Sequence, residues 1–282
     1  MDTTDLKKKA ERLRTLHKGP GILALCNVWD AASARIVEEA GFAALATSSA
    51  GIAFSLGYPD GQRVSREEMA EAVARITRAV AVPVTADMES GYGPAPEAAA
   101  ETVRSALAAG AVGINLEDAH GDREFFDVAL QVERVRAARE AADRAGVPLL
   151  INARTDVYLA GKGTPAEQFT EAVRRANAYH QAGADCLFLP GVADADVIER
   201  LVREIHGPIN ILAGPGTPPL RELERMGVRR VSLGSGPMRA TMALTREIAR
   251  ELAKTGSYAA LTRHTIPYRE ANRLFERHEG SR

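Results

Sequence analysis

From residue 22 onward, the chain repeats one pattern eight times: a short apolar run of strand length is followed by a longer segment with a helical pattern. A run that is apolar along its whole length is typical of a strand buried on both faces, and helices between such strands predict a parallel sheet. Eight of these units in about 235 residues match the TIM (β/α)8 barrel in number and length. The predicted strands cover residues 22–28, 43–48, 83–86, 113–116, 148–153, 186–189, 209–212 and 230–233. The predicted helices cover residues 31–40, 65–80, 97–109, 130–145, 165–182, 195–205, 218–226 and 237–254.

A doubly wound open sheet is the alternative, since the order of strands along a chain does not reveal whether the sheet closes. A dinucleotide-binding fold of that kind carries G-x-G-x-x-G after its first strand, and this chain has no such motif there. The barrel is therefore favoured, as a single domain spanning residues 1–282 with an N-terminal helix at 3–18. Residues 255–282 form a predicted C-terminal helical extension, with helical stretches at 258–263 and 268–278. Such an extension either packs on a neighbouring subunit or folds back on its own barrel.

Composition and charge exclude several kinds of partner. The 36 Lys and Arg residues nearly balance the 37 Asp and Glu residues, so no charge pattern indicates binding to nucleic acid or to a membrane surface. No apolar run approaches the roughly 20 residues that span a bilayer, and the charged start lacks the apolar stretch of a signal peptide. Cys26 and Cys186 each lie in an apolar run, which predicts two buried thiols in a reducing compartment. We therefore expect a cytoplasmic protein that acts on a small molecule.

The third predicted strand runs directly into two carboxylates. Asp87 and Glu89 are spaced i, i+2 and precede a Gly-Tyr-Gly turn. Alternation along a strand would place both side chains on the same side, where like charges repel unless a cation lies between them. A hard divalent cation with oxygen ligands, Mg²⁺ or Mn²⁺, explains the pair. The alternative is that both carboxylates lie at a solvated loop mouth.

Polar side chains follow other predicted strands as well, and the carboxyl ends of the strands carry the chemistry in a TIM barrel. The predicted acidic pocket for the cation comprises Asp60, Asp87, Glu89 and Glu117.

The predicted substrate-binding groups lie at neighbouring strand ends. Arg154 follows the fifth strand, and its guanidinium fork suits a carboxylate, although a salt bridge with Asp156 or Glu117 is the alternative. The turn formed by Ser48, Ser49, Ala50 and Gly51 offers N–H groups and hydroxyls to an anionic oxygen. A cation, an arginine and such a turn together predict a substrate with two or more anionic groups, such as a 2-oxo acid.

These motifs resemble the isocitrate lyase/phosphoenolpyruvate mutase superfamily. The resemblance covers roughly residues 20–255, and its motifs lie at residues 27–33, 47–60, 86–93, 113–118 and 151–156. It implies a TIM barrel that binds Mg²⁺ or Mn²⁺ near Asp87, with Asp60, Glu89 and Glu117 completing the shell partly through water. It also implies that Ser48, Ser49, Ala50 and Arg154 hold the carboxylate and oxo oxygens of a 2-oxo acid. An exchange of the eighth helix between subunits, in a dimer or a homotetramer, is a further implication.

The chain departs from the family patterns in the loop after the fourth strand. Lyases acting on isocitrate or methylisocitrate carry Lys-Arg-Cys-Gly-His there, but the segment 119–127 is short and has no cysteine. The longer gating loop of the phosphonate-forming mutases is missing too. Glu89 also stands where aspartate is usual, and its longer side chain still reaches a metal-bound water. A classical isocitrate lyase and a mutase are both disfavoured.

The remaining hypothesis is a Mg²⁺-dependent carbon–carbon lyase or decarboxylase that acts on a small 2-oxo or 2-hydroxy di- or tricarboxylate through a metal-stabilised enolate. Asp60 or Glu117 would manage metal-bound water, and His120 is a candidate proton carrier unless it is a solvated loop histidine. Trp29 is a candidate pocket wall, although a lone tryptophan is more often part of the core. The alternatives are a carbon–phosphorus enzyme, such as a phosphonopyruvate hydrolase or a phosphoenolpyruvate mutase, and a non-catalytic module that binds 2-oxo acids.

Overall fold

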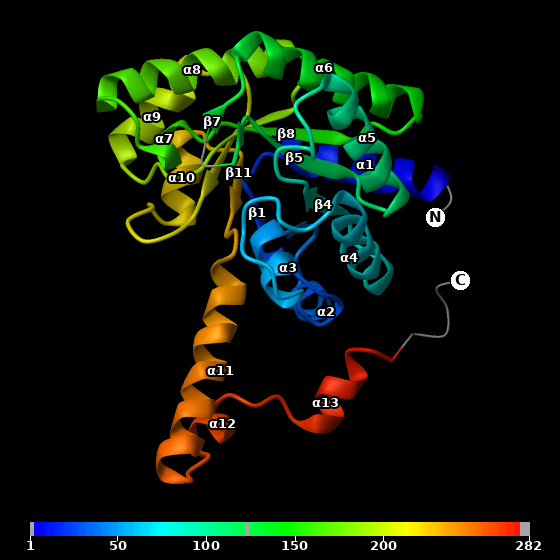
Figure 1. The fold of residues 1–282 in the computed structure, drawn as a ribbon, viewed down its shortest axis with the longest axis vertical. Coiled ribbons are helices and arrows are strands. Elements are labelled where there is room, and N and C mark those ends of the chain that lie inside the picture. Colours follow the sequence, from blue (N-terminus) through cyan, green and yellow to red (C-terminus); the bar gives the residue numbers. More distant parts are fainter. Residues whose placement is uncertain (1–2, 122–123, 277–282) are drawn as a thin grey trace.

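The computed structural model describes residues 3–121 and 124–276, and its centre is one sheet of nine parallel strands (Figure 1). The strand order is β1-β11-β10-β9-β8-β5-β4-β3-β2, so the two ends of the sheet, β1 and β2, are consecutive in the chain. The ring therefore closes through the chain itself, and the predicted TIM-type barrel is confirmed over the open sheet. The strands are β1 (Leu23–Leu25), β2 (Asn27–Val28), β3 (Leu45–Thr47), β4 (Val84–Asp87), β5 (Gly113–Glu117), β8 (Leu150–Arg154), β9 (Cys186–Leu189), β10 (Ile209–Leu212) and β11 (Arg230–Ser232).

The first predicted strand, 22–28, is divided in two at Cys26. The two halves pair with different neighbours: Leu23 lies opposite Arg230 of β11, and Asn27 lies opposite Ala46 of β3. This change of partner leaves Cys26 only half-buried, so its predicted burial is wrong, whereas Cys186 is fully buried.

Helices cover the outside of the barrel, and α1 packs across one end of it. Their ends follow local capping chemistry: Ser65 and Glu68 form a reciprocal capping box at the start of α4. The core beneath them consists mainly of Ala, Val, Leu and Ile. The helices are α1 (Thr3–Lys18), α2 (Ala31–Glu39), α4 (Arg66–Ala79), α5 (Pro96–Ala108), α6 (Val128–Arg144), α8 (Pro165–Gln181), α9 (Ala195–Glu204) and α10 (Leu220–Met226).

Two short helices and one pair of short strands in loops were not predicted. The helix α3 (Ser49–Ser55) follows β3, and it is capped because the Ser48 hydroxyl accepts the N–H of Gly51. A second short helix, α7 (Val157–Ala160), follows β8. The loop after β5 contains an antiparallel pair, β6 (Ala119–His120) and β7 (Glu124–Phe125), and residues 122–123 between them lie outside the described residues.

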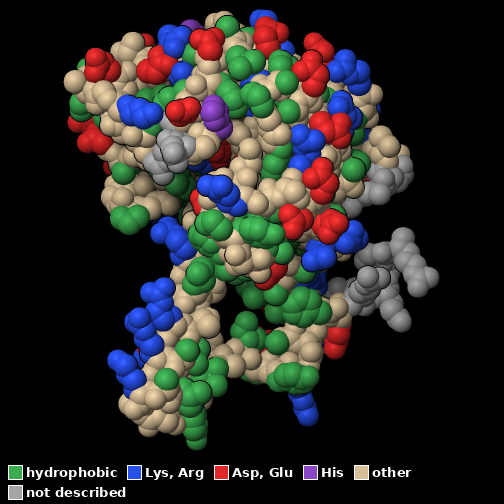
Figure 2. All heavy atoms as spheres, viewed as in Figure 1, with side chains coloured by type: hydrophobic (Ala, Val, Ile, Leu, Met, Phe, Trp, Pro, Cys, Tyr) green, Lys and Arg blue, Asp and Glu red, His purple; other side chains and the backbone are tan. Residues whose placement is uncertain are grey.

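The eighth helix, α11 (Gly236–Thr255), leaves the barrel and extends away from it (Figure 1). None of its residues is buried. Figure 2 shows basic side chains along one flank of this helix and apolar side chains along the other. Two short helices follow, α12 (Ala259–Arg263) and α13 (Tyr268–Arg273); the predicted helix 268–278 thus ends early, and its last two positions lie outside the described residues.

The extension returns to the barrel near its end. Leu274 is buried, and its carbonyl accepts a 2.5 Å hydrogen bond from the Arg35 side chain of α2. Within the part of the chain that the structure describes, no helix combines the length and apolar character needed to cross a bilayer.

Candidate active site

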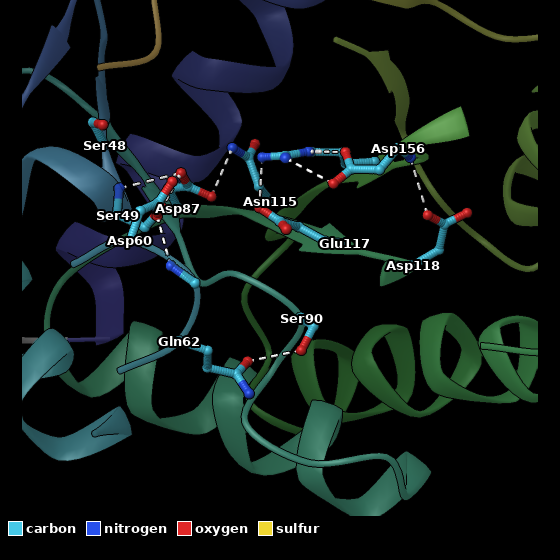
Figure 3. A network of polar contacts seen from close by, with 12 residues as sticks. Ser48, Ser49, Asp60, Gln62, Asp87, Ser90, Asn115, Glu117, Asp118 and Asp156 are labelled. Atoms are coloured by element: carbon cyan, nitrogen blue, oxygen red, sulfur yellow. Dashed lines mark hydrogen bonds and ion pairs between the residues drawn. The ribbon is translucent and has the colours of Figure 1, made fainter. Parts of the chain in front are cut away.

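A cavity of about 280 Å³ opens at the carboxyl ends of the strands. This volume lies at the small end of the range for ligand pockets, roughly 300–1,000 Å³, and therefore suits a small metabolite. The predicted site residues that line it are Ser48, Ser49, Ala50, Asp60, Asp87, Glu89, Glu117, His120 and Arg154. Figure 3 shows most of these polar side chains converging from different strands.

Two predicted residues do not line the cavity. Trp29 is half-buried and packs against the core, and a Cβ atom placed on Gly51 would lie 3.0 Å from its Cβ. Gly51 therefore faces the tryptophan, and its N–H is already donated to Ser48. The predicted substrate contacts of Trp29 and Gly51 are not supported by this arrangement.

Hydrogen bonds hold both carboxylate oxygens of Asp87 in place. One carboxylate oxygen accepts hydrogen bonds from the Ser49 hydroxyl (2.7 Å) and the Ser49 N–H (3.2 Å), and the other accepts from Asn115 (3.2 Å). The Asp87 N–H donates to the Thr47 hydroxyl at 2.8 Å. Neighbouring strand ends thus fix both oxygens of Asp87 at the cavity wall.

Glu89 reaches the same cavity by a route that strand alternation does not explain. β4 ends at Asp87, and Glu89 has a φ of 49°, in the left-handed region. Burial, together with the nearby charges of Asp87 and Asp60, raises the pKa of the Glu89 carboxyl to about 8. Acidic groups therefore crowd this part of the cavity, and a cation there would relieve their repulsion.

The loop that carries Glu89 is held in place by Arg134 of α6. This fully buried side chain donates to the carbonyls of Ser90 and Gly93 and, at 2.8 Å, to Gln131. Gly91 lies against it at a φ of +85°, and an added Cβ would lie 2.9 Å from Leu116. Such close packing fixes the path of the loop.

Gln62, which sequence reasoning missed, holds the other side of that loop. Its side-chain oxygen accepts a hydrogen bond from the Ser90 hydroxyl at 2.7 Å (Figure 3). The same oxygen accepts the Tyr92 N–H at 3.1 Å. A glutamine in an irregular segment gives no sequence signal for this role, because its partners lie about 30 residues further along the chain.

Arg154 forms both of the salt bridges that the sequence left open as alternatives. Its guanidinium contacts Glu117 at 2.5 Å and grips Asp156 with two bonds, at 2.5 and 2.9 Å. Burial opposes the charge of Arg154, but Glu117 and Asp156 outweigh it and raise its pKa. Burial also raises the pKa of Glu117, and Arg154 opposes that shift.

A second buried network holds Asp156, the partner of Arg154, in place. Asp118 accepts hydrogen bonds from the Asp156 N–H (3.1 Å), the Tyr179 hydroxyl (2.7 Å) and Arg175 (3.2 Å). These contacts link β5, β8 and α8, and they set the position of Asp156 and thereby of Arg154.

His120 lies at the rim of the cavity. It is exposed on β6 and stacks against Phe126, with ring centroids 4.6 Å apart. Both interpretations of this residue, proton carrier and solvated loop histidine, stay open.

Arg230 also lines the cavity and was missed in the sequence. A search confined to residues that follow strand ends passes over it, because it lies inside the eighth strand. The sequence signal was an arginine two positions before Ser232, a spacing that puts both side chains on the same face of the strand.

The oxygen donors of the cavity suit a hard divalent cation that keeps several water ligands. Among the residues with described positions, no three His, Cys, Asp or Glu side chains converge closely enough to enclose a metal ion alone. The fixed carboxylate of Asp87 and the crowded acids beside it therefore fit a cation held partly through water.

Comparison with known proteins identifies the family. The family model for phosphoenolpyruvate phosphomutase matches residues 13–253. An uncharacterized protein of Mycobacterium tuberculosis is 33% identical over 262 residues, which cover 90% of this chain and 95% of the relative. An oxaloacetate decarboxylase of Bradyrhizobium diazoefficiens is 32% identical over 218 residues, which cover 74% of this chain and 72% of that protein. A solved structure from Burkholderia cenocepacia, provisionally described as a lyase/mutase, has a TM-score of 0.90 and 39% identity. The match covers 96% of this chain and 97% of that chain. The chain therefore belongs to the phosphoenolpyruvate mutase/isocitrate lyase superfamily of lyases and mutases.

Proposed function

We propose that the protein is a Mg²⁺-dependent carbon–carbon lyase or decarboxylase that acts on a small 2-oxo or 2-hydroxy di- or tricarboxylate. The observation that carries this proposal is the meeting of Asp87, Glu89 and Asp60 with Arg154 in one small cavity at the carboxyl ends of the strands. Relatives described as oxaloacetate decarboxylase and 2-methylisocitrate lyase support the reaction class.

The proposed cation site uses Asp87 as the direct ligand. Asp60, Glu89 and Glu117 would complete the site, partly through water, and Mn²⁺ is an acceptable substitute for Mg²⁺. When bound, the cation supplies a Lewis acid for the 2-oxo and carboxylate oxygens of the substrate.

The chain's own groups would position the substrate and control its protons. Ser48, Ser49 and Ala50 line the wall beside Asp87 and would orient the carboxylate end of the substrate. Arg154 contacts Glu117 and Asp156 in the structure, so it would bind a substrate oxygen while keeping those partners. His120 at the rim is the proposed proton carrier, with Asp60 or Glu117 handling bound water.

A carbon–phosphorus enzyme is the second candidate. It is supported by the family model for phosphoenolpyruvate phosphomutase and by a structure of phosphoenolpyruvate phosphomutase from Streptomyces platensis, which is 26% identical with a TM-score of 0.83. The short segment 119–127 favours the carbon–carbon reaction.

The decisive experiment is a screen of 2-oxo and 2-hydroxy di- and tricarboxylates with Mg²⁺, following pyruvate and other carbonyl products. We expect turnover that EDTA abolishes and that Mg²⁺ restores. Asp87→Asn should lose this turnover, whereas the control Asp194→Asn, at the exposed start of α9, should keep it. Conversion of phosphonopyruvate, seen by phosphorus NMR, with no product from any carboxylate would replace the lyase with the second candidate.

The proposal extends to assembly and location. We propose a homodimer or homotetramer in which α11 and the following helices pack on a neighbouring subunit, since α11 buries no residue and Met242, Leu252, Tyr258 and Leu261 are exposed. The two free thiols, Cys26 and Cys186, support a location in the cytoplasm.

A further inference from the structure

Arg230 lies deeper in the cavity than the strand ends. It precedes Ser232 by two positions on β11, so both side chains point into the barrel, and both line the cavity. Only 1% of the Arg230 surface is exposed. Its neighbour across the sheet register is Asn210 of β10, which is also buried and lies 3.3 Å from the Ser232 hydroxyl. The inner wall formed by β10 and β11 is therefore polar.

The Arg230 guanidinium has no compensating partner in the described part of the chain. Its Nε and Nη1 atoms are buried without a hydrogen-bond acceptor, and no carboxylate of a described residue lies within 4 Å of it. Burial lowers the pKa of Arg230 to about 10, against the opposing effects of Cys186 and Asp87, so the group is still a cation at neutral pH.

Two other arginines, by contrast, have partners within the chain. Arg154 is neutralised by Glu117 and Asp156, and Arg134 donates to two backbone carbonyls. An unpaired buried charge destabilises a fold, and such a group is expected where a ligand supplies the missing anion. Among the arginines that line the cavity in the described part of the chain, Arg230 is thus the one without a carboxylate, because Arg154 already binds two.

We propose that Arg230 binds the second carboxylate of a dicarboxylate ligand and so selects dicarboxylates over monocarboxylates. This inference rests on the proposed function, which places the first carboxylate and its 2-oxo or 2-hydroxy group beside Asp87. Arg230 lies on β11 and Asp87 on β4, and the strands of the first and second units lie between them. A ligand bound beside Asp87 therefore needs a second anionic group at its other end to meet Arg230. Arg230 lines the cavity, and a guanidinium without a carboxylate partner suits a carboxylate of the ligand.

The test measures ligand selectivity by calorimetry in the presence of Mg²⁺. Malate and lactate share the 2-hydroxy carboxylate end, and only malate has a second carboxylate. The variant is Arg230→Met, which keeps an unbranched, flexible side chain but removes the guanidinium and its charge. The matched control is Arg139→Met, because Arg139 lies outside the cavity and donates to Leu149, Gly183 and Asp185.

We expect wild-type protein to bind malate more tightly than lactate. Arg230→Met should weaken malate binding by about ten- to a hundredfold, the usual effect of losing a hydrogen bond to a charged group, and should change lactate binding by less than about threefold. Arg139→Met should leave the ratio unchanged. Because an unpaired charge is removed, Arg230→Met should also raise the melting temperature, whereas Arg139→Met should lower it.

If Arg230→Met weakens malate and lactate binding equally, or changes neither affinity, the assignment of Arg230 is overturned. A lower melting temperature with unchanged selectivity would do the same and would show a structural role. Oxalate separates this failure from that of the proposed function. If wild-type protein binds oxalate with Mg²⁺ but does not prefer malate to lactate, only the role of Arg230 is wrong. If it binds none of these acids, the proposed function is wrong as well.

Discussion

Replacing Gly91 by alanine tests whether the loop that carries Glu89 is packed as tightly as the structure shows. Gly91 has a φ of +85°, and its added Cβ would lie 2.9 Å from Leu116 Cδ1 and 3.2 Å from Arg134 Nη2. Neither neighbour can move freely, since both are fully buried and Arg134 is hydrogen-bonded to the loop. The substitution must therefore strain the backbone and also displace a packed side chain.

The two contributions can be separated with a matched glycine. Gly57→Ala has nearly the same φ, +86°, but nothing lies within 4 Å of the new Cβ. Its expected loss is the backbone part alone, about 1–2 kcal/mol for a left-handed alanine. Gly91→Ala adds the overpacking of a filled core, about 1–3 kcal/mol. We therefore expect Gly91→Ala to lower the free energy of unfolding by about 2–5 kcal/mol in total.

Urea unfolding followed by circular dichroism, at one protein concentration for all variants, measures both losses. Calorimetric titration with Mg²⁺ should also show weaker binding for Gly91→Ala than for Gly57→Ala, because the displaced loop carries Glu89. Equal unfolding midpoints for the two variants would refute the close packing of Gly91 against Leu116 and Arg134.

Three further predictions follow from other parts of the molecule. His17 is buried with both ring nitrogens lacking an acceptor or donor among the described residues, and burial, aided by nearby arginines, lowers its pKa to about 3. Below about pH 6.5 the unfolded chain binds a proton that the folded chain does not, so the unfolding free energy should fall by up to about 1.4 kcal/mol per pH unit between pH 6.5 and 3. Urea titrations at several pH values should show a weaker dependence of the unfolding free energy on pH for His17→Leu. Tyr179→Phe should lower the unfolding free energy by about 1–3 kcal/mol, since Asp118 loses a buried 2.7 Å hydrogen bond; an unchanged urea midpoint would contradict this. Removal of residues 257–282 should reduce the solution mass measured by light scattering to that of a smaller assembly, and a monomeric mass for the full chain would instead favour an extension folded on its own barrel.

The sequence predicted the barrel and most of the cavity wall for one physical reason. Parallel strands bring their carboxyl ends to a common edge, so Asp87, Glu117 and Arg154 could be grouped without coordinates. The eight strand–helix units were also predicted from local patterns, although the first predicted strand is divided into β1 and β2.

What the sequence could not predict depends on contacts between distant residues or on backbone conformation. Glu89 reaches the cavity through a left-handed residue, a conformation that strand periodicity cannot foresee. Whether Arg154 was free or paired depended on side-chain orientation across β5 and β8. Arg230 lies within a strand, and its lack of a partner is visible only when the whole barrel interior is assembled.

The closure of the barrel through β1 and β11 also has a consequence for biosynthesis. Leu23 pairs with Arg230, more than 200 residues later in the chain, so β1 keeps an unpaired edge until nearly the whole protein has left the ribosome. Exposed strand edges are sites of aggregation, and contacts of long sequence separation form slowly. The interval before residues 230–232 emerge is therefore when the nascent chain is most exposed to misassembly, and a truncated product lacking β11 should depend most strongly on chaperones.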